Sequence, residues 1–484
     1  MAMGRALAVA LLGLNGHLVE VEADIGQTLP NFILLGLPDA SLNEAKERIR
    51  SAAQNCGIPL SRRKITVNLI PASLPKRGSA FDLAIVMAAL EAAGDVRGTD
   101  GTVFLAELGL DGRLRPVRGI LPAVMACVGA GRTRIVVAGA NAEEARLVPG
   151  ARVTGFESLA RVALAFGADP DAIVLEDFSA VAGAAGDRHP PAAGPPDPAP
   201  DLADVAGQPG ARLALEVAAA GGHHLMMVGP PGAGKTMLAE RLPGLLPDLG
   251  DEEAMEVTAI HSLDGRLGAD VSLIRRPPYE SPHHSASMPA IIGGGSGIPR
   301  PGAASRAHRG VLFLDEAPEY ERRVLDALRQ PLESGRVVLH RVVGTAAYPA
   351  RFQLVLAANP CPCGRATGKG ADCSCTAMAR RRYFGRLSGP LLDRVDIQLA
   401  VNRVSLPELA AAGDGEPSAL VAVRVAAARK RQLDRLEGYG MTRNAEAPGT
   451  LLRGALRLPS GTTTVLDRAL ERGALTARGY DRVL

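Results

Sequence analysis

The stretch GPPGAGKT has residue types and spacing that suit the binding of a phosphate group. It fits the pattern G-x-x-x-x-G-K-[ST], in which glycines let backbone N–H groups turn inward around phosphates. The lysine adds positive charge at the outer phosphates, and the threonine hydroxyl can ligate Mg²⁺. A chance glycine-rich turn is the alternative, but a strand pattern precedes the loop and a helical pattern follows it, as the motif requires. The candidate nucleotide-binding residues are Gly229, Pro230, Pro231, Gly232, Ala233, Gly234, Lys235 and Thr236.

Two carboxylates and an amide follow other apolar segments of the same region. Asp315 and Glu316 come directly after VLFL, and Asn359 follows FQLVLAA. Asp315 suits the Mg²⁺ shell, and Glu316 suits polarising an attacking water. Asn359 can orient that water or the terminal phosphate. Because a kinase must exclude water, two adjacent carboxylates at the end of such a strand favour a hydrolase.

Two arginines extend the predicted catalytic set. Arg394 lies in SGPLLDRVDI and Arg478 lies in LTARGYDRVL. A guanidinium that faces a terminal phosphate accelerates phosphoryl transfer by roughly 10³–10⁵. Either arginine could instead be a surface salt-bridge partner, and the residues alone leave both alternatives open.

A cluster of thiols follows Asn359. Cys361, Cys363, Cys373 and Cys375 form C-x-C, nine residues, then C-x-C. Four thiolates at short range can enclose a tetrahedral Zn²⁺. Because the four leave no ligand position open, the prediction is a structural zinc and not a catalytic one. A redox-sensitive loop and free thiols in a reducing cytosol are the alternatives.

These residues need sheets and helices to position them, and 484 residues suggest about three domains. Residues 1–177 mix strand and helix signals and predict an α/β domain. Residues 178–200 are rich in Pro, Ala, Gly and Asp without a period, which predicts a linker. Residues 201–400 return to strand–helix alternation, and residues 401–484 are helical in pattern. The fold class is therefore α/β with a helical C-terminal part.

Composition limits the classes of function. The net charge of +3 is nearly neutral, so any basic surface must be local. Cys56 and Cys127 are isolated and are expected to be buried apolar residues. The apolar N-terminal run continues into an alternating pattern, which favours an opening β-hairpin over a signal peptide. No apolar stretch reaches the ~20 residues that span a bilayer. We therefore expect a cytoplasmic protein with no membrane contact.

Three basic segments are candidates for contact with DNA phosphates and bases. The alternative is scaffold or inter-subunit packing for the first two segments, and a solvated helix face that pairs with acidic neighbours for the third. The first segment is long and rich in Gly and Pro, the second is a predicted hairpin, and the third, RRRYFGR, mixes basic with aromatic residues. Their residues are Arg275, Arg276, His283, His284, Arg306, His308 and Arg309; Arg336, His340 and Arg341; and residues 380–386.

The ordered set GPPGAGKT, GVLFLDE, LAANPCPCG, SGPLLDRVDI and LTARGYDRVL resembles the magnesium-chelatase-like AAA+ ATPases. Together with the N-terminal stretch it resembles the ComM-like (YifB-like) competence family over nearly the whole chain except the linker. The resemblance implies a homo-oligomeric ring, usually a hexamer, with ATP and Mg²⁺ at subunit boundaries.

The resemblance also implies roles for single residues. Lys235, Thr236, Asp315, Glu316 and Asn359 would serve the nucleotide from within one subunit. Arg394 would be the finger that reaches a neighbour's ATP, and Arg478 would be the sensor arginine of a helical lid. Gln208, in DLADVAGQPGA, would lie near the adenine. The family's lid continues beyond TARGYDRVL, so the resemblance implies that the lid over residues 401–484 is truncated.

The N-terminal domain resembles the Lon protease fold. LPKRGSAFDLAI matches the region of the Lon nucleophile, and Ser79 lies at or near that place. A serine needs an activating base, which in Lon is a lysine. The matching downstream stretch has no lysine, and Leu121 stands about where it would be. We therefore expect a Lon-like fold without protease chemistry.

The function that the family implies is a DNA motor. ComM-like proteins drive branch migration in natural transformation, extending the heteroduplex of incoming DNA. The expected partners are single-stranded or branched DNA and other copies of the chain, with recombination proteins as further candidates. The alternatives are a motor of the magnesium-chelatase type and an ATP-dependent protein remodeller with no DNA role.

Overall fold

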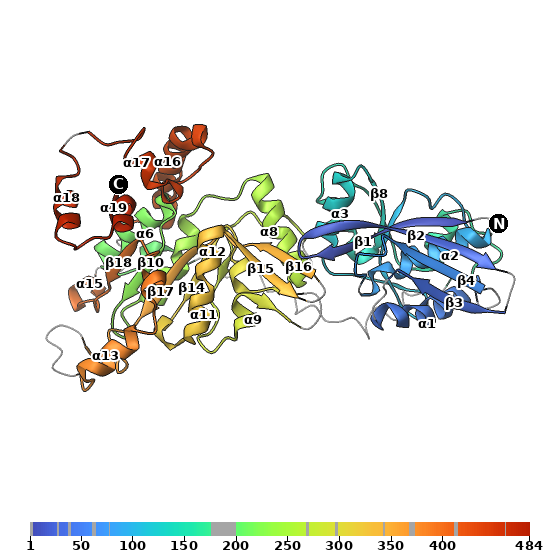
Figure 1. Cartoon of the computed structure of the whole chain (residues 1–484), viewed down its shortest axis with the longest axis horizontal. Helices are drawn as coiled ribbons and strands as arrows, with labels where there is room; N and C mark the ends of the chain where they lie inside the picture. The colour runs from blue at the N-terminus through green and yellow to red at the C-terminus, as the bar shows by residue number, and fades with distance from the viewer. Residues whose placement is uncertain are drawn as a thin grey trace.

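The computed structural model describes residues 3–26, 29–36, 40–60, 64–76, 78–175, 200–267, 271–295, 299–341, 344–366, 373–410, 415–459 and 461–484. The molecule is elongated, with an N-terminal body at one end and the C-terminal helices at the other (Figure 1). The predicted linker, residues 178–200, lies outside the described residues except for Pro200.

The N-terminal body is built on a seven-stranded mixed sheet in the order β3-β4-β2-β1-β5-β8-β9. The predicted opening hairpin is confirmed, because β1 and β2 pair antiparallel from Gly4↔Ala23 to Leu12↔Asn15. The strands of the sheet are β1 (Gly4–Leu12), β2 (Asn15–Gly26), β3 (Asn31–Leu35), β4 (Lys64–Ile70), β5 (Val103–Leu105), β8 (Arg134–Ala138) and β9 (Arg152–Phe156), and β6 (Glu107–Leu108) pairs separately with β7 (Leu114–Arg115). The helices are α1 (Ala40–Asn55), α2 (Asp82–Ala93), α3 (Ile120–Gly129), α4 (Ala142–Arg146) and α5 (Leu159–Ala165).

Helices cover both faces of this sheet, and alternate residues of β1 point to opposite faces. Ala6, Ala8 and Ala10 join the core under α1, α2 and α5. Val9 joins the core under α3 and α4. The sequence analysis did not find α2, because DLAIVMAALEAA is apolar on all sides and its burial leaves no helical period to detect.

The second body is built on a five-stranded sheet in the order β11-β14-β17-β10-β18, with every neighbouring pair parallel. Its apolar strands are buried on both faces, as covered parallel sheets require. The strands are β10 (Leu225–Val228), β11 (Tyr279–Glu280), β14 (Val311–Leu314), β17 (Gln353–Ala358) and β18 (Ile397–Ala400), with hairpins β12 (Gly293–Gly294)/β13 (Arg300–Pro301) and β15 (Arg336–Arg341)/β16 (Gly344–Pro349).

Helices flank this sheet and form the C-terminal part of the chain. Those of the sheet region are α6 (Pro209–Gly221), α7 (Lys235–Arg241), α8 (Asp251–Asp264), α9 (Met288–Ile291), α10 (Ala303–Arg306), α11 (Arg322–Ala327), α12 (Arg329–Ser334), α13 (Ala377–Phe384) and α14 (Gly389–Leu392). The C-terminal helices are α15 (Leu406–Ala410), α16 (Ser418–Leu436), α17 (Gly449–Leu452), α18 (Thr464–Glu471) and α19 (Ala477–Val483). Among the residues that the structure describes, no helix has the length and apolar character to cross a membrane.

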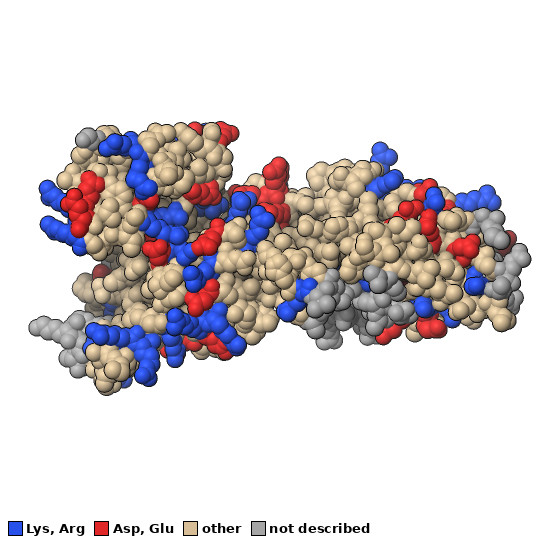
Figure 2. Space-filling model, in the orientation of Figure 1, with Lys and Arg blue, Asp and Glu red and all other residues tan. Residues whose placement is uncertain are grey.

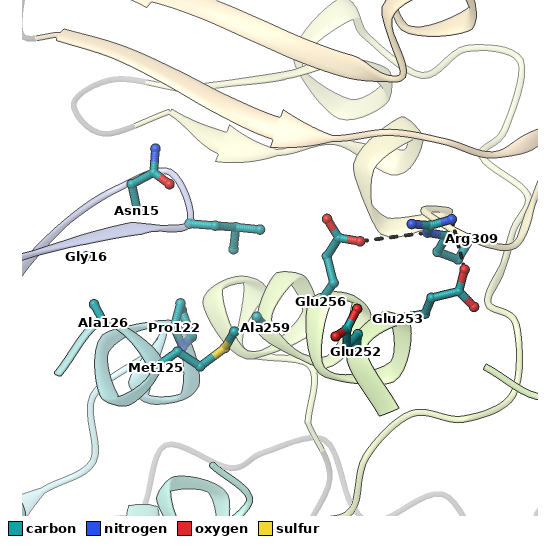
Figure 3. Close-up of a pocket in the computed structure, with 11 residues that line it drawn as sticks. Asn15, Gly16, Pro122, Met125, Ala126, Glu252, Glu253, Glu256, Ala259 and Arg309 are labelled. Atoms are coloured by element: carbon teal, nitrogen blue, oxygen red, sulfur yellow. Dashed lines mark ion pairs between the residues drawn. The ribbon is translucent and has the colours of Figure 1, made fainter. Parts of the chain in front are cut away.

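The two bodies meet where α3 packs on α8. The Gly119 N–H donates to the Ser262 carbonyl at 3.2 Å, and the buried Ala259 of α8 joins the N-terminal core. Beside this contact a cavity of about 600 Å³ opens between the β1–β2 turn, α3 and the acidic start of α8 (Figure 3). The candidate catalytic residues do not line it.

Candidate nucleotide-binding site

The candidate phosphate loop leaves the carboxyl end of β10, the strand between β17 and β18. Gly232 and Gly234 have φ of +76° and +88°, a region that favours glycine. A Cβ at Gly229 would lie 2.1 Å from the Val401 carbonyl oxygen, so the chain after β18 leaves no room for a side chain there. At each of these three positions, therefore, the local backbone favours glycine over a residue with a side chain.

Lys235 begins α7 and is buried. Its ammonium group donates to the carbonyls of Gly229 at 2.7 Å and Pro230 at 3.0 Å. It also donates to Asn359 Oδ1 at 3.2 Å, which joins the loop to the end of β17. Burial lowers the pKa of Lys235, while Asp315 and Glu316 oppose that shift.

The predicted Mg²⁺ ligands lie together. Thr236 Oγ1 donates to Asp315 Oδ2 at 2.7 Å, so a hydroxyl and a carboxylate meet beside the phosphate loop. These oxygen donors are the type that Mg²⁺ takes in phosphoryl-transfer sites. Glu316 follows Asp315 in the left-handed region, with φ of +50°, and its N–H donates to Asp315 Oδ1 at 2.8 Å. Its carboxylate is exposed.

The structure adds a residue that the sequence analysis had assigned elsewhere. His284, a candidate for DNA contact in the sequence, has its Nδ1 atom 3.1 Å from Glu316 Oε2. It is placed there because β11 pairs with β14, so the segment after Glu280 passes the carboxyl end of β14. No short motif links residues 284 and 316, so only the strand order reveals the pair.

Asn359 is held from two sides. Its side chain accepts from Lys235, and its backbone hydrogen-bonds the hydroxyl of Tyr383 on α13. Burial raises the pKa of Tyr383 to about 12, so the phenol stays protonated. Asn359 is therefore positioned at the phosphate loop as the sequence analysis predicted, with α13 as its support.

The two candidate arginines lie near each other and have other partners than these. Arg394 is buried and pairs with Glu333, and it also donates to the Pro390 carbonyl. Arg478 Nε lies 3.9 Å from Asp393 Oδ2, and its charge helps to lower the pKa of Arg394 after burial, the larger cause. The two guanidinium groups thus share one region of the molecule.

Gln208 lies at the start of α6 with φ of +55°, and its side-chain amide donates to the Asn402 carbonyl beyond β18. It therefore ties the segment before α6 to the segment that follows the last strand of the sheet. Its role near an adenine stays a prediction.

The four clustered cysteines converge, and all four thiols are free. Their ligand atoms lie within 4.8 Å of one another, close enough to hold a metal ion. Cys361 Sγ lies 3.3 Å from Cys363 Sγ and 3.6 Å from Cys373 Sγ. The Arg365 backbone N–H and the neighbouring Cys361 thiol lower the pKa of Cys363 to about 6.

Most basic residues of the first candidate DNA segment have partners inside the chain. Arg306 pairs with Glu280 at 2.9 Å, and Arg309 pairs with Glu253 at 2.9 Å. His308 is buried against Glu256. These pairs favour the packing alternative for these three residues. Arg275 and Arg276 are exposed, and Arg275 pairs with Asp251 at 2.7 Å.

The predicted hairpin is confirmed as β15–β16, with Arg336, His340 and Arg341 exposed. It contacts the N-terminal body, because a Cβ at Gly13 would lie 2.9 Å from the Ala347 carbonyl oxygen.

The third candidate DNA segment forms α13. Arg380, Arg381 and Arg382 are exposed. Tyr383 is buried and Phe384 packs on the core, so neither ring is available to stack on bases.

The region that resembles the Lon nucleophile has its polar groups engaged locally. The Ser79 hydroxyl donates to Glu107, and the buried Lys76 ammonium donates to the Pro71 carbonyl. Leu121 is buried at the start of α3, where its N–H donates to Glu144 Oε1 at 3.2 Å. α3 is thus the helix that docks on α8.

Sheet and loop together define the class of the second body. Numbered along the chain, its strands lie in the order 2-3-4-1-5, with the phosphate loop after strand 1, Asp315 after strand 3 and Asn359 after strand 4. This is a P-loop nucleotide-binding module with its site at the carboxyl ends of parallel strands.

Family models match three parts of the chain. The model described as magnesium chelatase, subunit ChlI, matches residues 201–409. Subunit ChlI of Mg-chelatase matches residues 21–141, and the ChlI C-terminal model matches residues 415–484.

Full-length relatives agree with these models. The competence protein ComM of Haemophilus influenzae is 39% identical, covering 100% of this chain and 92% of its own. YifB of Escherichia coli K12, an uncharacterized protein, is 40% identical over 98% of this chain and 90% of its own. An uncharacterized protein of Mycobacterium tuberculosis H37Rv is 51% identical over 100% of this chain and 93% of its own. The chain belongs to the ComM/YifB-like, magnesium-chelatase-like family of AAA+ proteins.

Proposed function

We propose that this protein is a ring-forming ATPase that moves DNA and promotes branch migration during recombination, as in natural transformation. The observation that carries the proposal is the meeting of Lys235, Thr236, Asp315 and Asn359 at one edge of the parallel sheet, in a chain similar to ComM over its full length. A cytoplasmic location is part of the proposal.

Each side chain has a role in hydrolysis of ATP. Thr236 and Asp315 would hold Mg²⁺, which would offset the charge of the outer phosphates. Lys235 carries positive charge at those phosphates. Glu316 accepts a hydrogen bond from the attacking water and orients it. Asn359, fixed by Lys235 and Tyr383, orients the terminal phosphate.

The positions of the two arginines support assembly into a ring, which we propose to be a hexamer. Arg394 and Arg478 lie together, so a neighbouring subunit that presents its nucleotide to one also presents it to the other. We propose that Arg394 leaves Glu333 to reach that nucleotide, and that Arg478 acts beside it as the sensor of the C-terminal helical lid. Gln208 is proposed to face the adenine.

α13 is the proposed contact with DNA. Its three consecutive arginines are exposed, and Lys and Arg side chains gather over this helix in Figure 2. Guanidinium contacts to phosphates release counterions, so DNA affinity should fall steeply as salt rises.

The N-terminal body is proposed to be a Lon-like platform without peptidase activity, because the Ser79 hydroxyl is engaged with Glu107 and not with a lysine. The cysteine cluster is proposed to hold structural Zn²⁺.

The test combines ATPase and branch-migration assays with a synthetic four-way junction. We expect single-stranded and branched DNA to stimulate hydrolysis, and migration to depend on ATP. Glu316→Gln should bind nucleotide and DNA but lose hydrolysis by about 10²-fold or more, because the neutral amide accepts a hydrogen bond but lacks the negative charge that polarises the attacking water. Replacing Arg380, Arg381 and Arg382 with Ala should weaken DNA binding, whereas Arg323→Ala, an exposed arginine paired with Glu321, is the matched control.

Hydrolysis that is insensitive to DNA would contradict the proposal. It would favour the alternative supported by the family models, an ATP-driven motor of the magnesium-chelatase type or a protein remodeller without a DNA role.

A further inference from the structure

Two thiol pairs meet beside the nucleotide site although nine residues separate them in sequence. Cys361 and Cys363 follow β17, and Cys373 and Cys375 precede α13. The Sγ–Sγ separations among Cys361, Cys363 and Cys373 are 3.3, 3.6 and 3.7 Å. Four sulfurs bound to one Zn²⁺ at about 2.3 Å in a tetrahedron lie about 3.8 Å apart. The thiols therefore have the spacing of a tetrathiolate metal site, and soft sulfur ligands select Zn²⁺ over Mg²⁺.

The first half of this cluster touches the phosphate loop. The turn after Cys361 is closed by the Gly364 N–H, which donates to the Cys361 carbonyl at 3.0 Å. At Gly364, with φ of +75°, a Cβ would lie 2.7 Å from Pro231 Cδ and 2.8 Å from Cγ. Pro231 is part of the loop itself, so the cysteine turn and the phosphate loop are in direct contact.

The second half reaches the same site through α13. Thr376, directly after Cys375, caps the helix by accepting from the Ala379 N–H at 3.1 Å. Seven residues further on, the hydroxyl of the buried Tyr383 bonds the backbone of Asn359. Asn359 thus lies between Cys361, two residues along the chain, and Tyr383, on the helix that the second cysteine pair precedes.

We propose that Zn²⁺ bound by Cys361, Cys363, Cys373 and Cys375 braces the nucleotide site by fixing both the turn against Pro231 and the helix that supports Asn359. One metal joins the ends of the loop that separates β17 from α13. With the ends joined, Pro231 and Asn359 keep the positions that Lys235 and the phosphates require. The inference rests on the proposed function in taking the phosphate loop to bind nucleotide and the four cysteines to hold Zn²⁺.

The test measures metal content and nucleotide affinity on the full-length chain. Zinc is determined by mass spectrometry, and a fluorescent ATP analogue reports binding under conditions without turnover. The double variant Cys373→Ser, Cys375→Ser removes two ligands without altering the turn at Pro231. Ser374→Ala changes the residue between them and is the matched control. Co²⁺ replacing Zn²⁺ gives an optical spectrum that identifies tetrahedral thiolate coordination.

We expect about one zinc per chain in the native protein and in Ser374→Ala, and none in the double variant. Nucleotide binding by the double variant should weaken about tenfold or more, the effect of losing one hydrogen bond to a charged group. Gly364→Ala should keep its zinc. Its nucleotide affinity should nevertheless fall below that of the native protein, because the added methyl group pushes on Pro231.

Two results would overturn the inference. If the native protein holds no zinc, the proposed metal site is wrong. If the double variant loses zinc but binds nucleotide with unchanged affinity, the metal does not brace the nucleotide site. A native protein that holds zinc but binds no nucleotide refutes the proposed function and with it the brace, while leaving the metal site established.

Discussion

At the scale of single residues, the site depends on hydrogen bonds between side chains that are far apart in sequence. Lys235 and Asn359 are 124 residues apart, and Thr236 and Asp315 are 79 apart. Each pair sets the position of a charged group or of a candidate Mg²⁺ ligand. Glu316 is proposed to accept a hydrogen bond from water, and its carboxylate lies 3.1 Å from His284.

His284→Ala should raise the basal rate of ATP hydrolysis without changing the KM for ATP. The imidazole and the attacking water compete for the same carboxylate, and an exposed ion pair is worth about 1 kcal/mol or less. We therefore expect an increase of up to about fivefold. Steady-state ATPase rates check this, with His340→Ala, an exposed histidine bonded to Thr345, as the control. A loss of activity comparable to that of Glu316→Gln would mean that His284 supports catalysis instead.

At the scale of elements, one histidine connects three strands of the nucleotide-binding sheet. His224 precedes β10, its Nδ1 accepts from the Leu354 N–H of β17 at 3.0 Å, and its carbonyl accepts from the Ile397 N–H of β18 at 3.1 Å. Accepting at Nδ1 requires that this nitrogen be unprotonated. Burial lowers the pKa of His224 to about 4, from an ordinary value near 6.5.

The sheet should therefore lose stability in mild acid. Because the folded pKa lies below the unfolded one, the unfolded chain binds more protons between pH 6.5 and 4. The contribution of His224 is complete above pH 6.5 and is lost as pH falls toward 4, by up to about 3 kcal/mol. Urea unfolding at pH 7.5 and pH 5 measures this loss.

His224→Asn provides the comparison, since its side chain keeps an acceptor and does not titrate. The variant should lose less stability between pH 7.5 and pH 5 than the native protein. Some loss should remain, because burial also lowers the pKa values of His261 and His308. Equal losses in the two proteins would show that His224 does not titrate in this range.

At the scale of the whole molecule, the N-terminal body is attached through the α3–α8 contact. The Ser262 hydroxyl of α8 donates to the buried Glu144 of α4, and Glu144 also accepts from the N–H of Leu121. The β15–β16 hairpin gives a second contact at the β1–β2 turn. Movement of the hairpin in a ring would therefore be transmitted to the N-terminal body.

Ser262→Val should weaken this attachment. Valine has nearly the shape of serine plus a methyl group but cannot donate, so the buried Glu144 loses a hydrogen bond at a cost of about 1–3 kcal/mol. We expect the thermal unfolding of the two bodies to separate in calorimetry. Ser285→Ala, at an exposed serine of the same body, should leave the trace unchanged. A variant that unfolds like the native protein would show that packing between α3 and α8 suffices.

The sequence by itself determined many of the local elements and the candidate residues of the phosphate site. The phosphate loop, Asp315 and Asn359 follow apolar strands, and this pattern depends only on neighbouring residues. The opening hairpin and the C-terminal helices were predicted on the same ground. α2 was missed because a helix buried on all sides has no period.

Only the tertiary structure decided which charged groups are free. Arg306, His308 and Arg309 look like a basic surface in sequence, but each meets a carboxylate from β11 or α8. His284 reaches Glu316, and Gly364 reaches Pro231, because parallel strands bring the ends of distant segments to one edge of the sheet. Electrostatic and steric contacts act through space, so composition and spacing along the chain do not contain them.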